Sequence, residues 1–110
     1  MSFRAWDPGE PTVPNRFGIE EPPADGRGDL AASALDVVVL PCTAVDRCGR
    51  RLGFGAGYYD RALADAGDGR GPLVVCVAFD VQVVGELPVR PWDVPADVVV
   101  TETGVRRPGP

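Results

Sequence analysis

The stretch RRLGFGAGYYDR, Arg50–Arg61, carries three glycines at alternate positions directly before a helical pattern. Because glycine has no side chain, such a stretch can turn several backbone N–H groups toward one point. The N-terminus of the following helix adds about half a positive charge at that point. Two arginines precede the glycines and an aspartate follows them. The stretch therefore predicts an anion-binding loop at the beginning of a helix, with phosphate as the natural anion.

Two common phosphate-binding motifs do not match this stretch. A Walker-type loop requires a GK[ST] sequence, and this chain contains no lysine. The dinucleotide fingerprint directly follows a strand, and the sequence indicates no strand immediately before the glycines. A tight connection into the helix is the purely structural alternative to phosphate binding.

Length and composition indicate a single soluble domain. The chain has 110 residues, of which 45% are hydrophobic, and a net charge of −5. All 11 basic residues are arginine, and acidic residues outnumber them. This balance argues against nonspecific binding to nucleic acid or to an anionic membrane surface. No apolar run is long enough to span a bilayer.

The N-terminus lacks the apolar core of a signal peptide, so a cytoplasmic, reducing location is expected. Cysteine usage agrees, because Cys42, Cys48 and Cys76 are odd in number and show no close pairing pattern. We expect them to be small core or loop residues. Histidine is absent, which excludes histidine acid–base chemistry, and a zinc site would need unusual ligands.

Turn-forming residues dominate residues 1–35, which are predicted to be largely irregular. Strands are predicted in three β-branched or apolar segments, Asp36–Leu40, Leu73–Phe79 and Asp97–Thr101. The second segment is apolar throughout, which is typical of a strand covered on both faces. The spacing of apolar residues predicts a helix over residues 58–66.

Strand, helix and strand in this order predict a right-handed βαβ crossover with parallel strands. The expected fold is therefore α/β, a single domain with a mainly parallel sheet and its core in residues 36–105. Ligands of such sheets bind outside the carboxyl ends of the strands. We expect the glycine-rich loop, the turn after Phe79 and the approach to the third strand to share that rim.

Many short segments of the chain follow one order that is typical of a known family. They are Phe3–Trp6, Asn15–Pro22, Asp36–Pro41, Asp46, Gly49, Arg51–Arg61, Val77–Phe79, Gln82, Leu87–Pro88, Asp93 and Asp97–Glu102. The block RLGFGAGYYDR within Arg51–Arg61 is the most specific of them. In this order the chain resembles the 5-formyltetrahydrofolate cyclo-ligases, which are also called methenyltetrahydrofolate synthetases.

The resemblance implies a three-layer α/β sandwich that uses ATP and Mg²⁺. The reaction it implies is the cyclisation of 5-formyltetrahydrofolate, a small folate substrate, to 5,10-methenyltetrahydrofolate. In that reaction the formyl oxygen is phosphorylated, N10 of the folate attacks the activated carbon, and phosphate leaves. ATP is needed because an amide-like formyl oxygen is a poor leaving group, whereas phosphate leaves easily.

Carried over by position, the resemblance assigns roles to residues of the loop and beyond it. Asp60 and Asp93 are implied as ligands of Mg²⁺, which prefers a few carboxylates together with water and phosphate oxygens. Tyr59 and Asp60 are the implied catalytic residues. The loop around the ATP phosphates is implied to be Arg51, Leu52, Gly53, Phe54, Gly55, Ala56, Gly57, Tyr58 and Tyr59.

Each assignment has a structural alternative. Asp60 can serve as an acid in the first turn of a helix, where it stabilises the helix dipole. Asp93 lies between two prolines and can shape a turn. Arg51 can pair with a surface acid such as Asp46, and Tyr59 can belong to the helix core.

Members of this family are longer at the N-terminus, where they carry helices, a first strand, and a lysine and an arginine that help to hold ATP. We therefore expect residues 1–110 to form an N-terminally truncated cyclo-ligase-like domain, of which full activity is not expected. An uncovered sheet face and edge predict marginal stability and self-association through that edge. The alternative functions are a catalytically inactive nucleotide-binding module and a fragment that needs a complementing chain.

Overall fold

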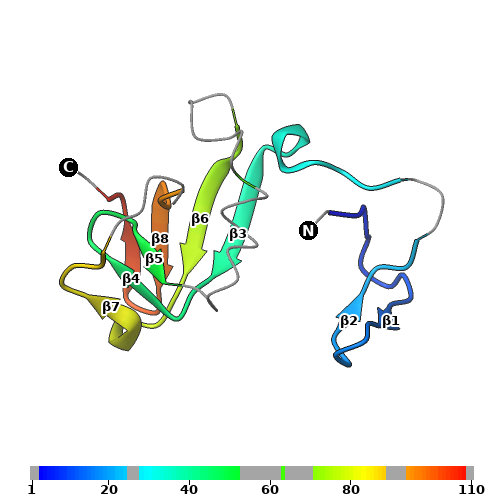
Figure 1. The fold of residues 1–110 in the computed structure, drawn as a ribbon, viewed down its shortest axis with the longest axis horizontal. Helices are drawn as coiled ribbons and strands as arrows, with labels where there is room; N and C mark the ends of the chain where they lie inside the picture. The colour runs from blue at the N-terminus through cyan, green and yellow to red at the C-terminus, as the bar shows by residue number, and fades with distance from the viewer. Residues whose placement is uncertain (1–2, 25–27, 53–62, 64–70, 89–93, 109–110) are drawn as a thin grey trace.

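The computed structural model describes residues 3–24, 28–52, 63, 71–88 and 94–108. Its largest sheet has four strands in the order β3-β6-β8-β9 (Figure 1). The strands β3, β6 and β8 are mutually parallel, and β9 returns antiparallel to β8. Their bounds are Val37–Pro41 for β3, Leu73–Val77 for β6, Val98–Thr101 for β8 and Gly104–Arg106 for β9.

The three segments predicted as strands form β3, β6 and β8, each within two residues of the expected bounds. Their β-branched residues fit a pleated sheet. The predicted parallel pairing of the first two is confirmed, with Val37 opposite Leu73. Pro41 is the last residue of β3, where the edge position tolerates its missing N–H. The helix predicted over 58–66 lies outside the described residues except for Leu63, which is fully buried.

A second, smaller sheet was not predicted. It consists of β5, β4 and β7 in that order, with β4 antiparallel to β5 and parallel to β7. These strands are Ala44–Asp46 for β4, Arg51–Leu52 for β5 and Val83–Val84 for β7. The glycine-rich stretch thus directly follows a strand, which corrects the sequence-based argument. The dinucleotide fingerprint still fails, because Tyr58 stands where its third glycine would be.

The N-terminal region contains a small antiparallel hairpin, β1 (Val13–Pro14) and β2 (Glu20–Glu21). The side-chain oxygen of Asn15 closes its turn by accepting two backbone N–H bonds. Figure 1 shows this hairpin set apart from the four-stranded sheet.

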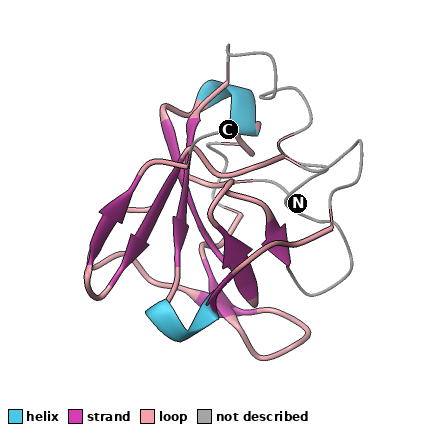
Figure 2. Ribbon diagram, turned by 90° about the vertical axis from the view of Figure 1, so that its left-hand side faces the viewer, coloured by secondary structure: helices cyan, strands magenta, loops and turns pink. Residues whose placement is uncertain are grey.

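Two short 3₁₀ helices, η1 (Ala32–Ala34) and η3 (Asp80–Gln82), lie at opposite ends of the main strands (Figure 2). They precede β3 and follow β6, respectively. The α/β class is confirmed, as mixed sheets with few helices.

The hydrophobic core lies on one face of the four-stranded sheet. Alternate residues of β3 and β6 point into it, namely Val38, Leu40, Val74 and Cys76. The residues between them point to the other face, where Leu73 is 41% exposed and Val39 is 61% exposed, but Val75 is part-buried. The expectation that β6 is covered on both faces holds only in part. On the second face Val75 and its neighbour Val98 are covered, whereas Leu73 and Val77 are half-exposed.

Candidate functional site

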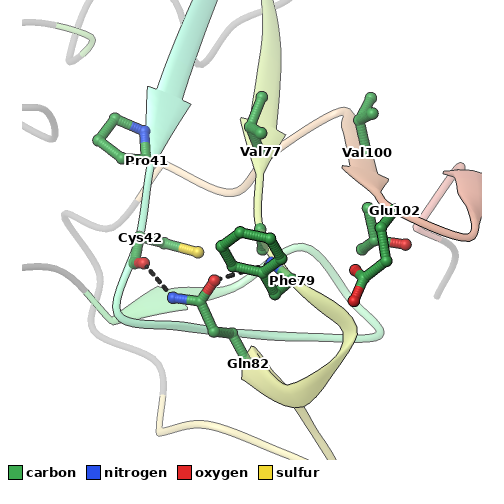
Figure 3. Close-up of a pocket in the computed structure, with 9 residues that line it drawn as sticks. Pro41, Cys42, Val77, Phe79, Gln82, Val100 and Glu102 are labelled. Carbon is green, nitrogen blue, oxygen red and sulfur yellow. Dashed lines mark hydrogen bonds between the residues drawn. The ribbon is translucent and has the colours of Figure 1, made fainter.

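A cavity of about 480 Å³ lies at the carboxyl ends of the three parallel strands (Figure 3). We call it the carboxyl-edge pocket. Ligands of parallel sheets bind in such places, because the strand ends and the turns after them leave a crevice there. The pocket is lined by Pro41, Cys42, Val77, Ala78, Phe79, Gln82, Val100, Thr101 and Glu102.

Gln82 joins two strand ends at the floor of this pocket. Its amide nitrogen donates to the carbonyl oxygens of Cys42 at 2.9 Å and Thr43 at 3.2 Å. Its amide oxygen accepts the N–H of Phe79 at 2.8 Å. One side chain thus satisfies three backbone groups that no sheet ladder reaches, and it holds the end of β3 next to the turn after β6.

Glu102 lines one side of the pocket, and Asp80 is bonded to it just outside the lining. Glu102 Oε1 accepts the backbone N–H of Asp80 at 2.7 Å, and Asp80 Oδ2 accepts the hydroxyl of Thr103 at 2.6 Å. Hydrogen bonds from the hydroxyls of Thr101 and Thr103 lower the pKa of Asp80, and Arg106 lowers it further. Asp80 is therefore ionised at neutral pH, and this side of the pocket disfavours anions.

Two thiols meet beneath the pocket. The sulfur atoms of Cys42 and Cys76 are 3.2 Å apart, and both residues are buried. Burial, followed by the hydrogen bond to Cys42, raises the pKa of Cys76 to about 12. Cys76 is therefore a neutral thiol near pH 7 and not a nucleophile. The prediction of small core or loop cysteines is confirmed, because Cys48 lies in the turn between β4 and β5.

Asp46, at the end of β4, is a buried carboxylate with 2% exposure. Its Oδ1 accepts the backbone N–H groups of Cys48 at 2.9 Å and Arg50 at 3.0 Å. Its Oδ2 accepts the N–H of Leu87 at 2.9 Å. Asp46, expected to be a surface acid, is thus a buried carboxylate at the centre of a partly exposed turn.

The two arginines at the beginning of β5 have different partners. Arg50 lies with Nε 3.8 Å from Asp46 Oδ2, and its Nη1 donates to the carbonyl of Leu87 at 3.2 Å. Arg51 donates from Nη2 to the carbonyl of Val94 at 3.0 Å. The arginine that pairs with Asp46 is therefore Arg50, which corrects the alternative interpretation of Arg51.

The expected sharing of one rim is wrong for the residues directly before β8. Asp97 lies at the amino end of β6, where its N–H donates to the carbonyl of Val74 and its carboxylate accepts the Val74 N–H. Because β8 runs parallel to β6, the chain must enter β8 at the amino edge. The carboxyl-edge pocket instead collects residues that follow the strands.

Of the predicted site residues, the structure describes Arg51 and the half-exposed Leu52. The other predicted residues, Gly53 to Tyr59, Asp60 and Asp93, lie outside the described residues. Within the described part of the chain, no cluster of three or more potential metal ligands occurs. Asp46 does not suit a metal, because its oxygens already accept three backbone N–H bonds.

The family model of the 5-formyltetrahydrofolate cyclo-ligase family matches residues 3–102. The chain belongs to this family. The 5-formyltetrahydrofolate cyclo-ligase of Escherichia coli (strain K12) is 42% identical over 105 residues, which cover 96% of this chain and 57% of that protein. The mitochondrial 5-formyltetrahydrofolate cyclo-ligase of Arabidopsis thaliana is 40% identical over 111 residues, which cover 87% and 40% of the two chains.

A solved structure agrees with this assignment to the cyclo-ligase family. The NMR structure of Aquifex aeolicus 5,10-methenyltetrahydrofolate synthetase has a TM-score of 0.74 and 42% sequence identity to this chain. The match covers 96% of this chain and 52% of that one. This cyclo-ligase-family chain thus spans about half the length of the relatives it matches.

The positions of Asp46 and Gln82 match the cyclo-ligase pattern, but the observed roles, the centre of a turn for Asp46 and a link between strand ends for Gln82, were not predicted. For Asp46 a local signal existed, since an aspartate three residues before Gly49 is typical of a tight turn whose amides bond to the side chain. For Gln82 the bond to Phe79 is local, but nothing nearby in the sequence indicates its other partners, because Cys42 and Thr43 are 40 and 39 residues away. No helix among the described residues is long and apolar enough to cross a membrane.

Proposed function

We propose that this chain takes part in the ATP- and Mg²⁺-dependent cyclisation of 5-formyltetrahydrofolate to 5,10-methenyltetrahydrofolate. The observation that carries the proposal is the family match over residues 3–102, which includes the glycine-rich loop. In this proposal the loop from Arg51 to Tyr59 binds the ATP phosphates, and Asp60 and Asp93 hold the metal. Bound Mg²⁺ would offset the charge that develops during phosphoryl transfer.

The contacts around Arg51 support these assignments of the loop to the phosphates and of Asp93 to the metal. The hairpin of β4 and β5 leads into the loop at Leu52. The side chain of Arg51 donates to the carbonyl of Val94, which directly follows Asp93 in the sequence. Arg51, at the beginning of the loop, and Val94, next to Asp93 in the sequence, are therefore neighbours. The carboxyl-edge pocket, with its acidic side, suits an uncharged or cationic part of a substrate better than a phosphate.

We expect Asp60→Asn to reduce formation of 5,10-methenyltetrahydrofolate by about 100-fold, because an amide is a weak ligand for Mg²⁺. The measurement is the absorbance of the product with ATP, Mg²⁺ and 5-formyltetrahydrofolate present. The exposed Asp7→Asn is the matched control and should retain activity. Equal rates for wild type and Asp60→Asn would contradict the assignment.

The alternative proposal is a nucleotide-binding module without catalysis. The coverage of about half of the relatives' length favours keeping it. Calorimetry distinguishes the two proposals: the module binds ATP with Mg²⁺ but forms no product, whereas the enzyme does both.

We further propose that two copies of the chain associate through the edge of β3 and the apolar face beside it. No described strand pairs with the outer edge of β3, and Val37 and Val39 are 51% and 61% exposed. Such edges favour pairing with another chain.

In sedimentation velocity, Val39→Lys should weaken association about tenfold, because the charge must be buried at the contact. Val81→Lys, at an 87% exposed position outside the sheet, should not. Identical behaviour of both variants would contradict this interface.

We also propose the finer architecture of a three-layer sandwich with a βαβ crossover. Parallel neighbours such as β3 and β6 require a crossover connection, and the buried Leu63 comes from the middle of that connection. A cytoplasmic, reducing location is proposed as well, and the free thiols of Cys42, Cys48 and Cys76 support it.

A further inference from the structure

The hairpin of β4 and β5 is bonded to both ends of one distant segment, residues 87–96. At the first end, the N–H of Leu87 donates to Asp46 and its carbonyl accepts from Arg50. At the other end, the carbonyl of Val94 accepts from Arg51. The N–H of Ala96 also donates to the carbonyl of Gly49 at 2.8 Å. Four hydrogen bonds thus join the segment to a single turn.

Asp46 is the group on which this arrangement depends. It is 2% exposed, and one of its oxygens shapes the turn while the other holds Leu87. A carboxylate is required, because both oxygens must be acceptors. The neighbouring Arg50 pairs with the same carboxylate and reaches the same residue, Leu87. The same carboxylate therefore holds both the turn at Cys48 and Arg50 and the backbone of Leu87.

We infer that Asp46 is a positioning residue, which holds the segment carrying Asp93 in a fixed relation to the beginning of the glycine-rich loop. This inference rests on the proposed function, in which Asp93 holds the metal and the loop holds the ATP phosphates. In the sequence Asp93 directly precedes Val94 and the loop directly follows Leu52, and the hairpin contacts Val94 through Arg51. A metal between two acids from separate segments demands such a fixed separation.

The test uses Asp46→Asn in the full chain. An asparagine can keep its oxygen on the Cys48 and Arg50 amides, but its NH₂ group then faces the N–H of Leu87, so that two donors meet. We expect hydrogen exchange at the Leu87 amide to become about tenfold faster or more, while amides of β6 change by less than about twofold. Arg50→Met, which keeps the aliphatic stem but removes the donors, should act in the same direction.

The matched control is Glu86→Gln. Glu86 pairs with the same arginine at 3.5 Å, but its side chain is 83% exposed. Exchange at Leu87 should not change in this variant. Unchanged exchange at Leu87 in Asp46→Asn, or equal acceleration at Leu87 and throughout β6, would overturn the inference. Unchanged exchange at Leu87 would mean that Asp46 does not hold Leu87. Equal acceleration throughout β6 would mean that Asp46 only stabilises the fold as a whole.

A second readout concerns the metal. In Asp46→Asn we expect ATP affinity with Mg²⁺ to fall about tenfold and ATP affinity in EDTA to change by less than about threefold, because only the metal-bearing segment is displaced. Equal losses with and without Mg²⁺ would contradict the positioning role. A wild-type chain without Mg²⁺-dependent ATP binding would contradict the proposed function, and with it the role at that site. The exchange measurement needs no nucleotide, so it still decides whether Asp46 holds the segment.

Discussion

Replacing Asp46 by alanine should lower the free energy of unfolding by about 3–5 kcal/mol. The substitution removes the acceptor of three backbone N–H groups, those of Cys48, Arg50 and Leu87. Each buried donor left without a partner costs about 1–3 kcal/mol. Since domains of this size are stable by only about 5–15 kcal/mol, the loss would be a large fraction of the total.

Urea denaturation measures this loss as a lower midpoint with an unchanged slope. The matched control is Asp29→Ala, which removes an ion pair with Arg4 at a carboxylate that is 53% exposed. Exposed pairs contribute about 1 kcal/mol or less, so this control should unfold close to the wild type. If Asp46→Ala also unfolded within 1 kcal/mol of the wild type (about the value of one exposed pair), the buried turn would not be the stabilising element described above.

Gly49→Ala should destabilise the chain by about 2–4 kcal/mol, for two separate reasons. Gly49 has φ of +82°, a left-handed conformation that disfavours any side chain. An added Cβ would also collide with the backbone carbonyl oxygen of Ala96, which cannot move without breaking its contact to the turn. The melting temperature should fall by about 10 °C or more.

Two other glycines separate these causes. Gly18 has φ of +77° but open space around it, so Gly18→Ala should show the backbone cost alone. Gly85 has open space and no left-handed φ, so Gly85→Ala should be close to neutral. The expected order of melting temperatures is Gly85→Ala above Gly18→Ala above Gly49→Ala. A Gly49→Ala variant as stable as Gly18→Ala would contradict the close approach to Ala96.

The three parallel strands of the main sheet were predictable because they carry long local signals, whereas its fourth strand, the three-residue β9, was not predicted. Five consecutive β-branched or apolar residues in β3 and in β6 indicate strands without reference to the rest of the chain. The small sheet of β5, β4 and β7 was not predictable. Its strands have two or three residues, too few for any periodicity to show, and their pairing depends on partners far away in the sequence.

The candidate site divides in the same way. The glycine-rich stretch is recognisable in the sequence, because the block RLGFGAGYYDR is specific to one family, although alternate glycines alone would also fit a tight structural connection. The residues that hold the surrounding segments, Asp46 and Gln82, cannot be recognised from the sequence in this way. Their roles depend on partners that only the fold brings close, namely Leu87 for Asp46 and Cys42 for Gln82.

From the order of its residues alone, the chain indicates its family and its parallel strands and predicts an anion-binding loop, since each depends on neighbours close along the chain. Folding assigns the partners of Arg50 and Arg51, buries Asp46 and brings Leu87, Val94 and Ala96 beside the hairpin of β4 and β5. The physical reason is that a charge or an amide is satisfied by whatever group lies within about 3 Å, and long-range packing alone determines which group that is.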